Sequence, residues 1–338
     1  MSPFPMTLSR HILEQGQKHP AITGELSTLI AQLGFTGKSL AREMRRAALV
    51  GELGLVGERN ATGDAQKKLD VFSNEVMVDA FTATGLVAAI ASEELEDIKH
   101  VQSGNEGKYI LCTDPLDGSS NTDINGALGT IFGFYRREKA GTGATPDEVL
   151  RPGTELVLAG YILYSTSTMF VYSAGKGVHG FTLDADLGES LLSHRDMKCP
   201  PKGKTFSANT GHVREWPKGV QDYISYVTEV DKESGRPYSH RYSGALVGDV
   251  HRILLEGGIY FYPPDPSHKQ GKLRLLYECS PLAFLAEQAG GAATSNGERV
   301  TQIRPKAVHD RCPFAIGGKD DVALFDRIVA GKGPPAGS

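Results

Sequence analysis

An alternation of helical and strand-like segments through both halves of the chain is the feature that most constrains its fold. Apolar residues recur at helical spacing over residues 24–49 and again over 64–83. The short apolar runs at 86–91 and 109–113 are instead typical of buried strands. Helices alternating with strands in this way predict the α/β fold class.

The middle of the chain is rich in strand-forming residues and then becomes turn-rich. Two apolar runs within 157–172 meet at Ser165-Thr166-Ser167 and predict a hairpin, which strands at 177–183 and 188–192 continue. Pro and Gly punctuate the polar run 197–204, so we expect a domain boundary there. The second half adds predicted helices at 219–227, 247–256 and 281–289 and predicted strands at 258–262 and 313–316.

Glycine weakens helices and marks turns, and this leads to two further expectations. Gly34 and Gly37 should interrupt the helix predicted at 24–49. The polar segment 138–152 should be a surface loop.

Length and charge exclude several classes of protein. The 338 residues suggest two domains, and 36 Lys and Arg against 40 Asp and Glu leave no chain-wide basic footprint for nucleic acid. No apolar run is long enough to span a membrane, and the N-terminus lacks the pattern of a secretory signal. The cysteines form no CxxC pair, so we expect reduced thiols and a cytoplasmic location; they are Cys112, Cys199, Cys279 and Cys312.

The most informative motif is the octapeptide 114–121, DPLDGSSN, which follows an apolar strand. Its carboxylates, Asp114 and Asp117, can point into one concavity, and hard divalent cations such as Mg²⁺ take oxygen ligands of this kind. The Gly-Ser-Ser-Asn that follows offers consecutive backbone N–H groups to an anion. Together these features favour phosphate ester chemistry, although a plain turn capped by Asp is the alternative.

Other acidic residues stand at the ends of predicted elements. Glu93 and Glu94 close an apolar run, but such a cluster is also typical of a solvated helix start. Asp64 and Asp70 are six residues apart, which does not place both on one helical face. Glu278 follows an apolar run and precedes a helix with Pro at its start. If these points converge, they form a site for several metal ions.

Five motifs stand out along the chain: SEE at 92–94, KKLD at 67–70, DPLDGSSN at 114–121, RYSGALVGDVHR at 241–252 and GKLRLLYECSP at 271–281. On these motifs the chain resembles class I fructose-1,6-bisphosphatases, above all the bacterial members of that family, from about Thr23 to Gly318. DPxDG alone is shared with the wider inositol-phosphatase superfamily. The resemblance implies two stacked α/β domains in a layered sandwich of helices and sheets. It also implies Mg²⁺-dependent removal of the 1-phosphate to give fructose 6-phosphate, a step of gluconeogenesis.

The resemblance assigns roles to the acidic residues. It implies two or more Mg²⁺ per subunit, with Mn²⁺ as a substitute, held by Glu93, Asp114, the Leu116 carbonyl, Asp117 and Glu278. Asp70 and Glu94 would polarise the attacking water, and Asp64 would assist the leaving group. Bound cations can acidify a water and neutralise charge on the in-line oxygens, which agrees with these roles.

The resemblance also implies two phosphate cradles. Asp117, Gly118, Ser119, Ser120 and Arg274 would face the 1-phosphate. The residues that would hold the other phosphate are Asn209, His212, Arg241, Tyr242, Tyr262 and Lys272. Arg241 is typically lent by a neighbouring subunit, which suggests a homotetramer. His212 stands where the family commonly has Tyr, so the affinity of this cradle for phosphate would depend on pH. Without the resemblance, the positively charged residues of this group would be interpreted as the solvated edge of a strand.

AMP inhibits many members of this family at a separate site. The matching positions are Thr23, Gly24, Glu25, Leu26, Ser27, Lys108, Tyr109 and Arg136. Free N–H groups at a helix start suit a phosphate, although an ordinary helix cap looks the same. We therefore expect AMP inhibition, with residues 1–196 as the regulatory domain that supplies most metal ligands and 197–338 as the substrate-binding domain. The segment 138–152 contains no Cys, so thioredoxin-type control is not expected.

Three other functions compete with this interpretation. A sedoheptulose-1,7-bisphosphatase, or an enzyme with dual specificity in the Calvin cycle, would use the same residues. An inositol monophosphatase would not need the second phosphate cradle. A non-catalytic metabolite sensor would have no need of the full set of carboxylates. Phosphate release from fructose 1,6-bisphosphate with and without Mg²⁺ separates these functions.

Overall fold

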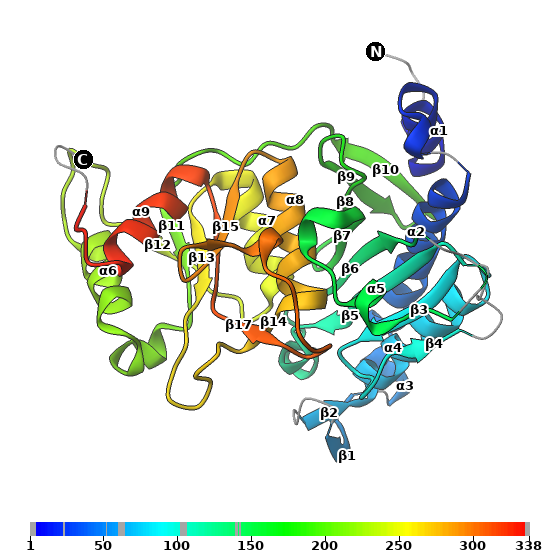
Figure 1. Cartoon of the computed structure of the whole chain (residues 1–338), viewed down its shortest axis with the longest axis horizontal. Coiled ribbons are helices and arrows are strands. Elements are labelled where there is room, and N and C mark those ends of the chain that lie inside the picture. Colours follow the sequence, from blue (N-terminus) through cyan, green and yellow to red (C-terminus); the bar gives the residue numbers. More distant parts are fainter. Residues whose placement is uncertain are drawn as a thin grey trace.

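The computed structural model describes residues 5–22, 24–51, 53–59, 65–101, 107–138, 141 and 143–334. Within them, helices and sheets alternate in five layers, which Figure 1 shows from right to left. An outer layer of helices covers a large sheet, two helices separate this sheet from a smaller one, and a helix pair covers the far face. The α/β fold class and the layered sandwich predicted from the sequence are confirmed.

The helices have the following bounds: α1 Leu8–Lys18, α2 Glu25–Met44, α3 Ala47–Val50, α4 Lys68–Thr82, α5 Pro146–Val149, α6 Lys218–Thr228, α7 Leu246–Glu256, α8 Ser280–Gln288 and α9 Lys319–Val329. Helices α1, α2 and α4 form the first outer layer. Helices α7 and α8 lie between the sheets, and α6 packs on α9 in the last layer.

The large sheet has the strand order β10-β9-β8-β7-β6-β5-β3-β4 in the described residues. Its strands are β3 Val87–Ser92, β4 Lys99–His100, β5 Tyr109–Asp117, β6 Leu128–Arg136, β7 Leu156–Tyr164, β8 Thr168–Ser173, β9 His179–Asp184 and β10 Glu189–His194. The hairpin predicted around Ser165-Thr166-Ser167 is β7 and β8, paired from Tyr164 and Thr168 onward. Only β3 and β5 run parallel among these neighbours, and both are buried along their whole length.

The smaller sheet has the order β12-β11-β13-β18-β15-β16. Its strands are β11 Thr205–Ser207, β12 Ser239–His240, β13 Ile259–Tyr262, β15 Ala292–Ser295, β16 Glu298–Arg299 and β18 Phe314–Gly317. Two small pairs flank the sheets: β1 Leu55–Arg59 with β2 Ala65–Lys67, and β14 Leu273–Arg274 with β17 Arg311–Cys312.

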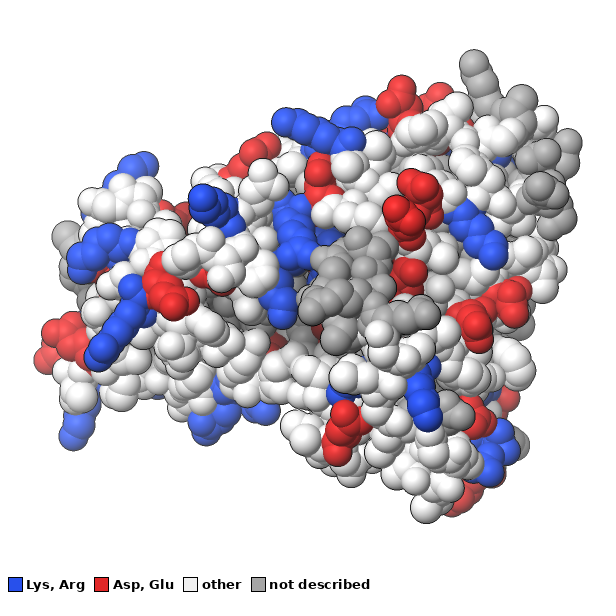
Figure 2. All heavy atoms as spheres, turned by 90° about the horizontal axis from the view of Figure 1, so that it is seen from below, with Lys and Arg blue, Asp and Glu red and all other residues white. Residues whose placement is uncertain are grey.

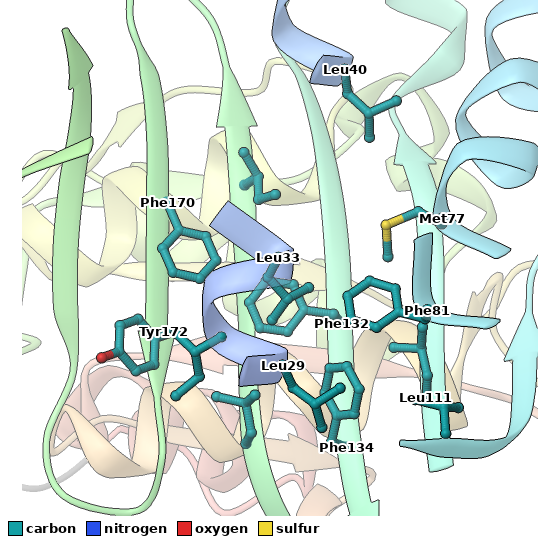
Figure 3. Packing of buried hydrophobic residues seen from close by; sticks show 14 of the residues in the cluster. Leu29, Leu33, Leu40, Met77, Phe81, Leu111, Phe132, Phe134, Phe170 and Tyr172 are labelled. Carbon is teal, nitrogen blue, oxygen red and sulfur yellow. The ribbon is translucent and has the colours of Figure 1, made fainter. Parts of the chain in front are cut away.

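Helix α2 buries one face because its apolar residues repeat at helical spacing. In Figure 3, Leu29 and Leu33 lie against Phe132 and Phe134 of the large sheet. The predicted interruption at Gly34 and Gly37 is wrong, since α2 is continuous. A Cβ on Gly34 would lie 2.5 Å from Leu8 Cδ2, and one on Gly37 would lie 2.6 Å from Ile162 Cδ1. These glycines therefore allow close packing rather than a break.

The segment 138–152 is not a surface loop throughout. Residues Pro146–Val149 form α5, which begins with a capping box between Thr145 and Glu148. Val149 is fully buried and Ala144 is nearly so. The prediction of a surface loop was wrong because Ala144 and Val149 belong to a buried cluster that includes Leu156 and other residues of the large sheet.

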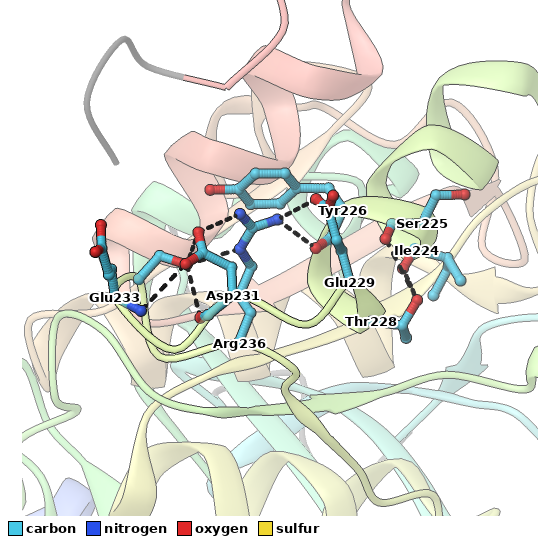
Figure 4. Close-up of polar contacts among 9 residues, drawn as sticks. Ile224, Ser225, Tyr226, Thr228, Glu229, Asp231, Glu233 and Arg236 are labelled. Atoms are coloured by element: carbon cyan, nitrogen blue, oxygen red, sulfur yellow. Dashed lines mark hydrogen bonds and ion pairs between the residues drawn. The ribbon is translucent and has the colours of Figure 1, made fainter.

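A network of polar contacts closes the loop after α6 (Figure 4). The Arg236 guanidinium donates to Glu229 Oε2 at 3.0 Å and to Asp231 Oδ2 at 2.8 Å. It also lies 3.8 Å from the centre of the Tyr226 ring. This loop leads to the edge of the smaller sheet at β12.

The surface charge, the helices and the cysteines agree with the expectations from composition. Basic and acidic side chains are interspersed on the face in Figure 2. Among the described residues, no helix combines the length and apolar character that crossing a membrane requires. All four cysteines are buried and form no disulfide.

Candidate active site

Three carboxylates meet where the parallel pairing of β3 with β5 ends. Ser92 pairs with Thr113, and the backbone N–H of Glu93 donates to the Thr113 carbonyl at 3.2 Å. Glu93 and Asp114 therefore lie side by side just beyond the last β3–β5 pair, as their positions after apolar runs predicted, although β5 itself continues to Asp117. Glu278 completes the group, and ligand atoms of the three side chains lie within 4.8 Å of one another.

Glu278 comes from a π-helical turn, Leu275–Cys279, that leads directly into α8. Its carboxylate accepts a short hydrogen bond from the backbone N–H of Arg274. The Arg274 guanidinium lies 2.7 Å from Glu93 Oε1 and 3.7 Å from Glu278 Oε1. One cation thus already bridges carboxylates from the two halves of the chain. Single-turn π segments often occur at functional sites.

Burial makes this concentration of negative charge costly. Desolvation, and then the charges of Glu93, Asp117 and Glu278, hold the pKa of Asp114 well above its ordinary value. Desolvation likewise raises the pKa of Glu278 to about 8, although the nearby Arg274 opposes the rise. Carboxyl groups that repel one another in a buried cluster are stabilised by a bound cation.

Asp117 is the last residue of β5 and lies against the start of α7. Its two carboxylate oxygens accept from the backbone N–H groups of Leu246, at 3.2 Å, and Val247, at 2.7 Å. Burial nevertheless raises the pKa of Asp117 to about 7. Gly118 follows with a φ of 80°, which favours glycine, and leads into the 3₁₀ turn Ser119–Ile124.

Asp70 and Glu94 line the same cavity as the cluster. Asp70 lies in the first turn of α4, where its Oδ2 accepts from the backbone N–H of Lys67 at 2.8 Å. Its Oδ1 is buried without a hydrogen-bond partner among the described residues. Desolvation raises the pKa of Asp70 to about 6. Glu94 accepts a short hydrogen bond from the Gln66 side chain.

These groups line one cavity of about 390 Å³. It brings together the following residues predicted from the sequence: Asp70, Glu93, Glu94, Asp114, Leu116, Asp117, Gly118, Ser119, Ser120, Tyr242, Tyr262, Lys272, Arg274 and Glu278. The lining combines carboxylates with Lys272 and the phenols of Tyr242 and Tyr262. The Lys272 Nζ lies 5.9 Å from the centre of the Tyr262 ring. Such a cavity can hold both cations and an anionic group.

The comparisons with known proteins agree over nearly the whole chain. A family model described as Fructose-1-6-bisphosphatase, N-terminal domain, matches residues 6–195, and the model of its C-terminal domain matches residues 199–330. The class 1 fructose-1,6-bisphosphatase 2 of Acaryochloris marina is 56% identical over 327 residues, which cover 96% of this chain and 97% of the relative. The chain belongs to the fructose-1,6-bisphosphatase family. The resemblance read from the sequence motifs is therefore confirmed.

Other members of the family extend this result. The class 1 enzyme of Chloroherpeton thalassium is 46% identical over 327 residues, covering 96% of this chain and 94% of that protein. The crystal structure of Leishmania major fructose-1,6-bisphosphatase in holo form matches with a TM-score of 0.89 at 37% identity, covering 96% of this chain and 99% of that one. The family fold thus accounts for the arrangement of both sheets.

Three residues that the resemblance assigns to the second phosphate lie outside the main cavity. Asn209 and His212 line a small adjoining hollow that shares Tyr262 with it. His212 is exposed, and its Nδ1 lies 3.0 Å from Glu215 Oε2. Arg241 is also exposed, and its guanidinium donates to the His240 carbonyl at 2.9 Å. Asp64 is not among the described residues.

The described residues expected to bind AMP lie at the start of α2, at the beginning of β5 or just before it, and at the end of β6. Lys108 Nζ lies 2.7 Å from Glu25 Oε1, and Tyr109 pairs with Arg136 across the strands. Gly24 precedes α2 with a φ of 58°. Leu26 is buried, and the Ser27 hydroxyl donates to the Ile22 carbonyl at 2.8 Å, so both side chains are engaged within the fold. Thr23 is not among the described residues.

The sequence reasoning missed part of the cavity lining. Lys67 lines the cavity, and its Nζ lies 2.9 Å from both Thr122 Oγ1 and Asp123 Oδ2. It stands in the KKLD motif, so that motif was the available signal. The other unpredicted lining residues are Leu55, Gly244, Leu246, Tyr260 and Leu273. Gly244 and Leu246 belong to the RYSGALVGDVHR segment, and Leu273 belongs to the GKLRLLYECSP segment.

Proposed function

We propose that this chain hydrolyses fructose 1,6-bisphosphate to fructose 6-phosphate and phosphate in a reaction that depends on Mg²⁺. The observation that carries the proposal is the buried group of Glu93, Asp114 and Glu278 in one cavity with Lys272 and Arg274. Relatives named fructose-1,6-bisphosphatase class 1 support the choice of substrate. Gluconeogenesis is the pathway that such an activity serves.

The donor set fits a hard divalent cation. Oxygen is the only ligand atom that the three side chains offer, which suits Mg²⁺ or Mn²⁺ rather than a soft metal. Asp117 and the Leu116 carbonyl would add oxygens for a second ion, because both residues line the same cavity. When bound, such ions would acidify a coordinated water and neutralise charge on the phosphoryl oxygens.

The other side chains have roles that follow from their places. The backbone of Ser119 and Ser120, at the start of a 3₁₀ turn, would hold the reacting phosphate beside the carboxylates. Arg274 would neutralise part of its charge. Asp70 would accept a proton from the attacking water, because its Oδ1 is buried and has no partner among the described residues. Glu94 would help orient that water, and Asp64 would assist the leaving group.

Another part of the cavity lining would hold the second phosphate. Tyr242, Tyr262 and Lys272 supply two phenolic hydroxyls and one cation there. Asn209 and His212 would close this cradle from the adjoining hollow. Arg241 lies exposed on the surface. In a homotetramer, the Arg241 side chain of a neighbouring subunit would complete this cradle. Two anion-binding groups of residues in one cavity favour a bisphosphate over a monophosphate.

The decisive experiment measures phosphate release from fructose 1,6-bisphosphate with Mg²⁺, with Mn²⁺ and with a chelator. We expect turnover only with a cation, and we expect Asp114→Asn to lose at least 100-fold in kcat. A panel with sedoheptulose 1,7-bisphosphate and an inositol monophosphate defines the substrate range. Absence of phosphate release from the fructose bisphosphate with either cation would refute the proposal.

We also propose that AMP inhibits the enzyme at the start of α2. The support is the ion pair between Lys108 and Glu25 beside the N-terminus of a long helix, together with the neighbouring Arg136. Lys108→Ala should retain turnover and lose inhibition by AMP. A wild-type enzyme that is indifferent to millimolar AMP would contradict this site.

A further inference from the structure

A histidine outside the cavity joins two of the segments that carry the carboxylates. His309 lies in the loop before β17 and is half-buried. Its Nε2 lies 3.0 Å from the carbonyl oxygen of Leu95 and 3.2 Å from that of Glu96. Its Nδ1 lies 2.7 Å from the hydroxyl oxygen of Tyr277. One ring therefore contacts residues that are more than 180 positions apart in the chain.

The partners determine which nitrogen carries the proton. A carbonyl oxygen can only accept, so Nε2 of His309 must be the N–H donor to Leu95 and Glu96. In the neutral ring, Nδ1 then accepts from the Tyr277 hydroxyl. Tyr277 is fully buried, and its hydroxyl supplies the proton for this bond. Every hydrogen bond of this arrangement thus has a donor and an acceptor.

All three partner residues of His309 lie within three positions of a proposed cation ligand in the sequence. Leu95 and Glu96 follow Glu93 and Glu94, and the near end of that turn is held by the bond from Glu93 to Thr113. His309 holds the far end. Tyr277 immediately precedes Glu278 in the π-helical turn.

The loop that carries His309 is itself fixed to the same turn. The backbone N–H of Leu275, the first residue of the π-helical turn, donates to the Asp310 carbonyl at 2.7 Å. The Asp310 carboxylate in turn accepts from the backbone N–H of Ala307 at 3.0 Å. The backbone around His309 is therefore held by hydrogen bonds, and the histidine can keep the two acidic segments at a fixed distance from each other.

We propose that His309 is a positioning residue that holds the Glu93–Glu94 turn and the Glu278 turn at the separation that a divalent cation needs. The inference rests on the proposed metal-dependent function. Carboxylates that repel one another in a buried site move apart unless the surrounding structure holds them. Groups that orient the ligands of a metal typically change its affinity 10- to 100-fold when removed.

The chain contains a matched control for a purely structural Tyr–His pair. Tyr161 of β7 is hydrogen-bonded to His251 of α7, with its Oη 2.7 Å from the Nδ1 of the histidine. Both tyrosines are fully buried, and neither Tyr161 nor His251 lines the cavity described above. Tyr161→Phe should therefore cost stability without altering cation binding.

The test compares wild type with His309→Phe, His309→Gln, Tyr277→Phe and Tyr161→Phe. Mn²⁺ binding is measured directly by electron paramagnetic resonance, and phosphate release is titrated with Mg²⁺. His309→Phe should weaken Mn²⁺ binding and raise the half-saturating Mg²⁺ concentration about 10-fold. The KM for the sugar bisphosphate at saturating Mg²⁺ should stay within about 2-fold of wild type, since His309 touches no substrate in this scheme.

The remaining variants decide between positioning and mere support of the fold. His309→Gln keeps a donor and an acceptor, so it should recover most of the affinity for Mn²⁺. Tyr277→Phe removes a single hydroxyl, keeps the proposal testable if His309→Phe does not fold, and should shift the affinity in the same direction. Wild-type Mn²⁺ affinity in both Tyr277→Phe and a folded His309→Phe would overturn the inference. A wild-type chain that binds Mn²⁺ but releases no phosphate would refute the proposed function alone.

Discussion

Gly118 shows how much one residue can determine beside the acidic cluster. A Cβ at this position would lie 2.6 Å from the Cβ of Ala245, and the φ of 80° is unfavourable for any other residue. Gly118→Ala should therefore lower the free energy of unfolding by about 2 kcal/mol or more, combining backbone strain with the clash. It should also reduce phosphate release, because the turn positions Ser119 and Ser120.

Gly188 provides the control for Gly118. It also has a positive φ, 66°, but a Cβ added there meets nothing within 4 Å. Gly188→Ala should cost only the backbone term of about 1–2 kcal/mol and leave phosphate release unchanged. Denaturant unfolding of both variants separates strain from the clash. Equal losses of stability and unchanged activity in both would contradict this account of Gly118.

Single residues also show where sequence reasoning reaches its limit. DxxDG marked Asp114 and Asp117 as candidates because it places two carboxylates in a glycine turn after a strand, but a plain turn capped by Asp remained the alternative until the longer motifs were considered. The contact of Asp117 with the backbone of Val247 was not foreseen. It joins residues 130 positions apart in the chain, and no local pattern encodes such a pairing.

At the scale of the element, the glycines of α2 set the distance between the helix and the large sheet. Gly37→Ala would place a methyl group 2.6 Å from Ile162 Cδ1. Ile162→Val removes that Cδ1 atom and by itself costs about 0.5–1.5 kcal/mol. We expect the double variant to lose about 1 kcal/mol less than the sum of the single variants. Chemical denaturation measures the cycle, and strict additivity would show that the helix moves away instead.

The docking of α1 predicts a dependence of stability on pH. His11 of α1 is fully buried against His179, with ring centres 4.5 Å apart, and neither of its nitrogens has a partner among the described residues. Desolvation, and then the charge of His179, lowers the pKa of His11 to about 4. The unfolded chain therefore binds more protons between about pH 6.5 and 4, and stability falls as pH decreases through this window.

His11→Phe should remove this contribution. The ring would remain among Tyr172, His179 and Phe181, and no hydrogen bond to a described residue would be lost. The variant should be close to wild type in Tm at pH 7.5 and more stable than wild type near pH 4.5. Thermal unfolding across this range measures the effect. Parallel pH profiles for the two proteins would contradict it.

Elements differed in how far the sequence predicted them. The buried runs of β3 and β5 and the hairpin of β7 and β8 were recognised because apolar composition and turn residues are local signals. The π-helical turn Leu275–Cys279 was not recognised, since its form depends on contacts with Asp310 and Arg274. The two-residue strands β14 and β17 have no sequence pattern of their own.

For the whole molecule, the cluster of carboxylates couples the two halves of the chain. Glu93 and Asp114 come from the first half and Glu278 from the second. A cation bound by all three would stabilise the junction by RT ln(1 + [L]/Kd), about 2.7 kcal/mol at 100 times its Kd. Without the cation, the same carboxyls oppose folding, as the raised pKa of Glu278 indicates.

Glu278→Gln should therefore change stability in opposite directions with and without Mg²⁺. With a chelator, the variant has one buried acidic group fewer and should match or exceed wild type in Tm, since its amide oxygen can still accept from Arg274 N–H. With saturating Mg²⁺, wild type should gain stability and the variant should not. Glu298→Gln, at an exposed residue of β16, is the matched control and should gain as wild type does. If Mg²⁺ raises the Tm of Glu278→Gln as much as that of wild type, the cation is not held at the junction of the two halves.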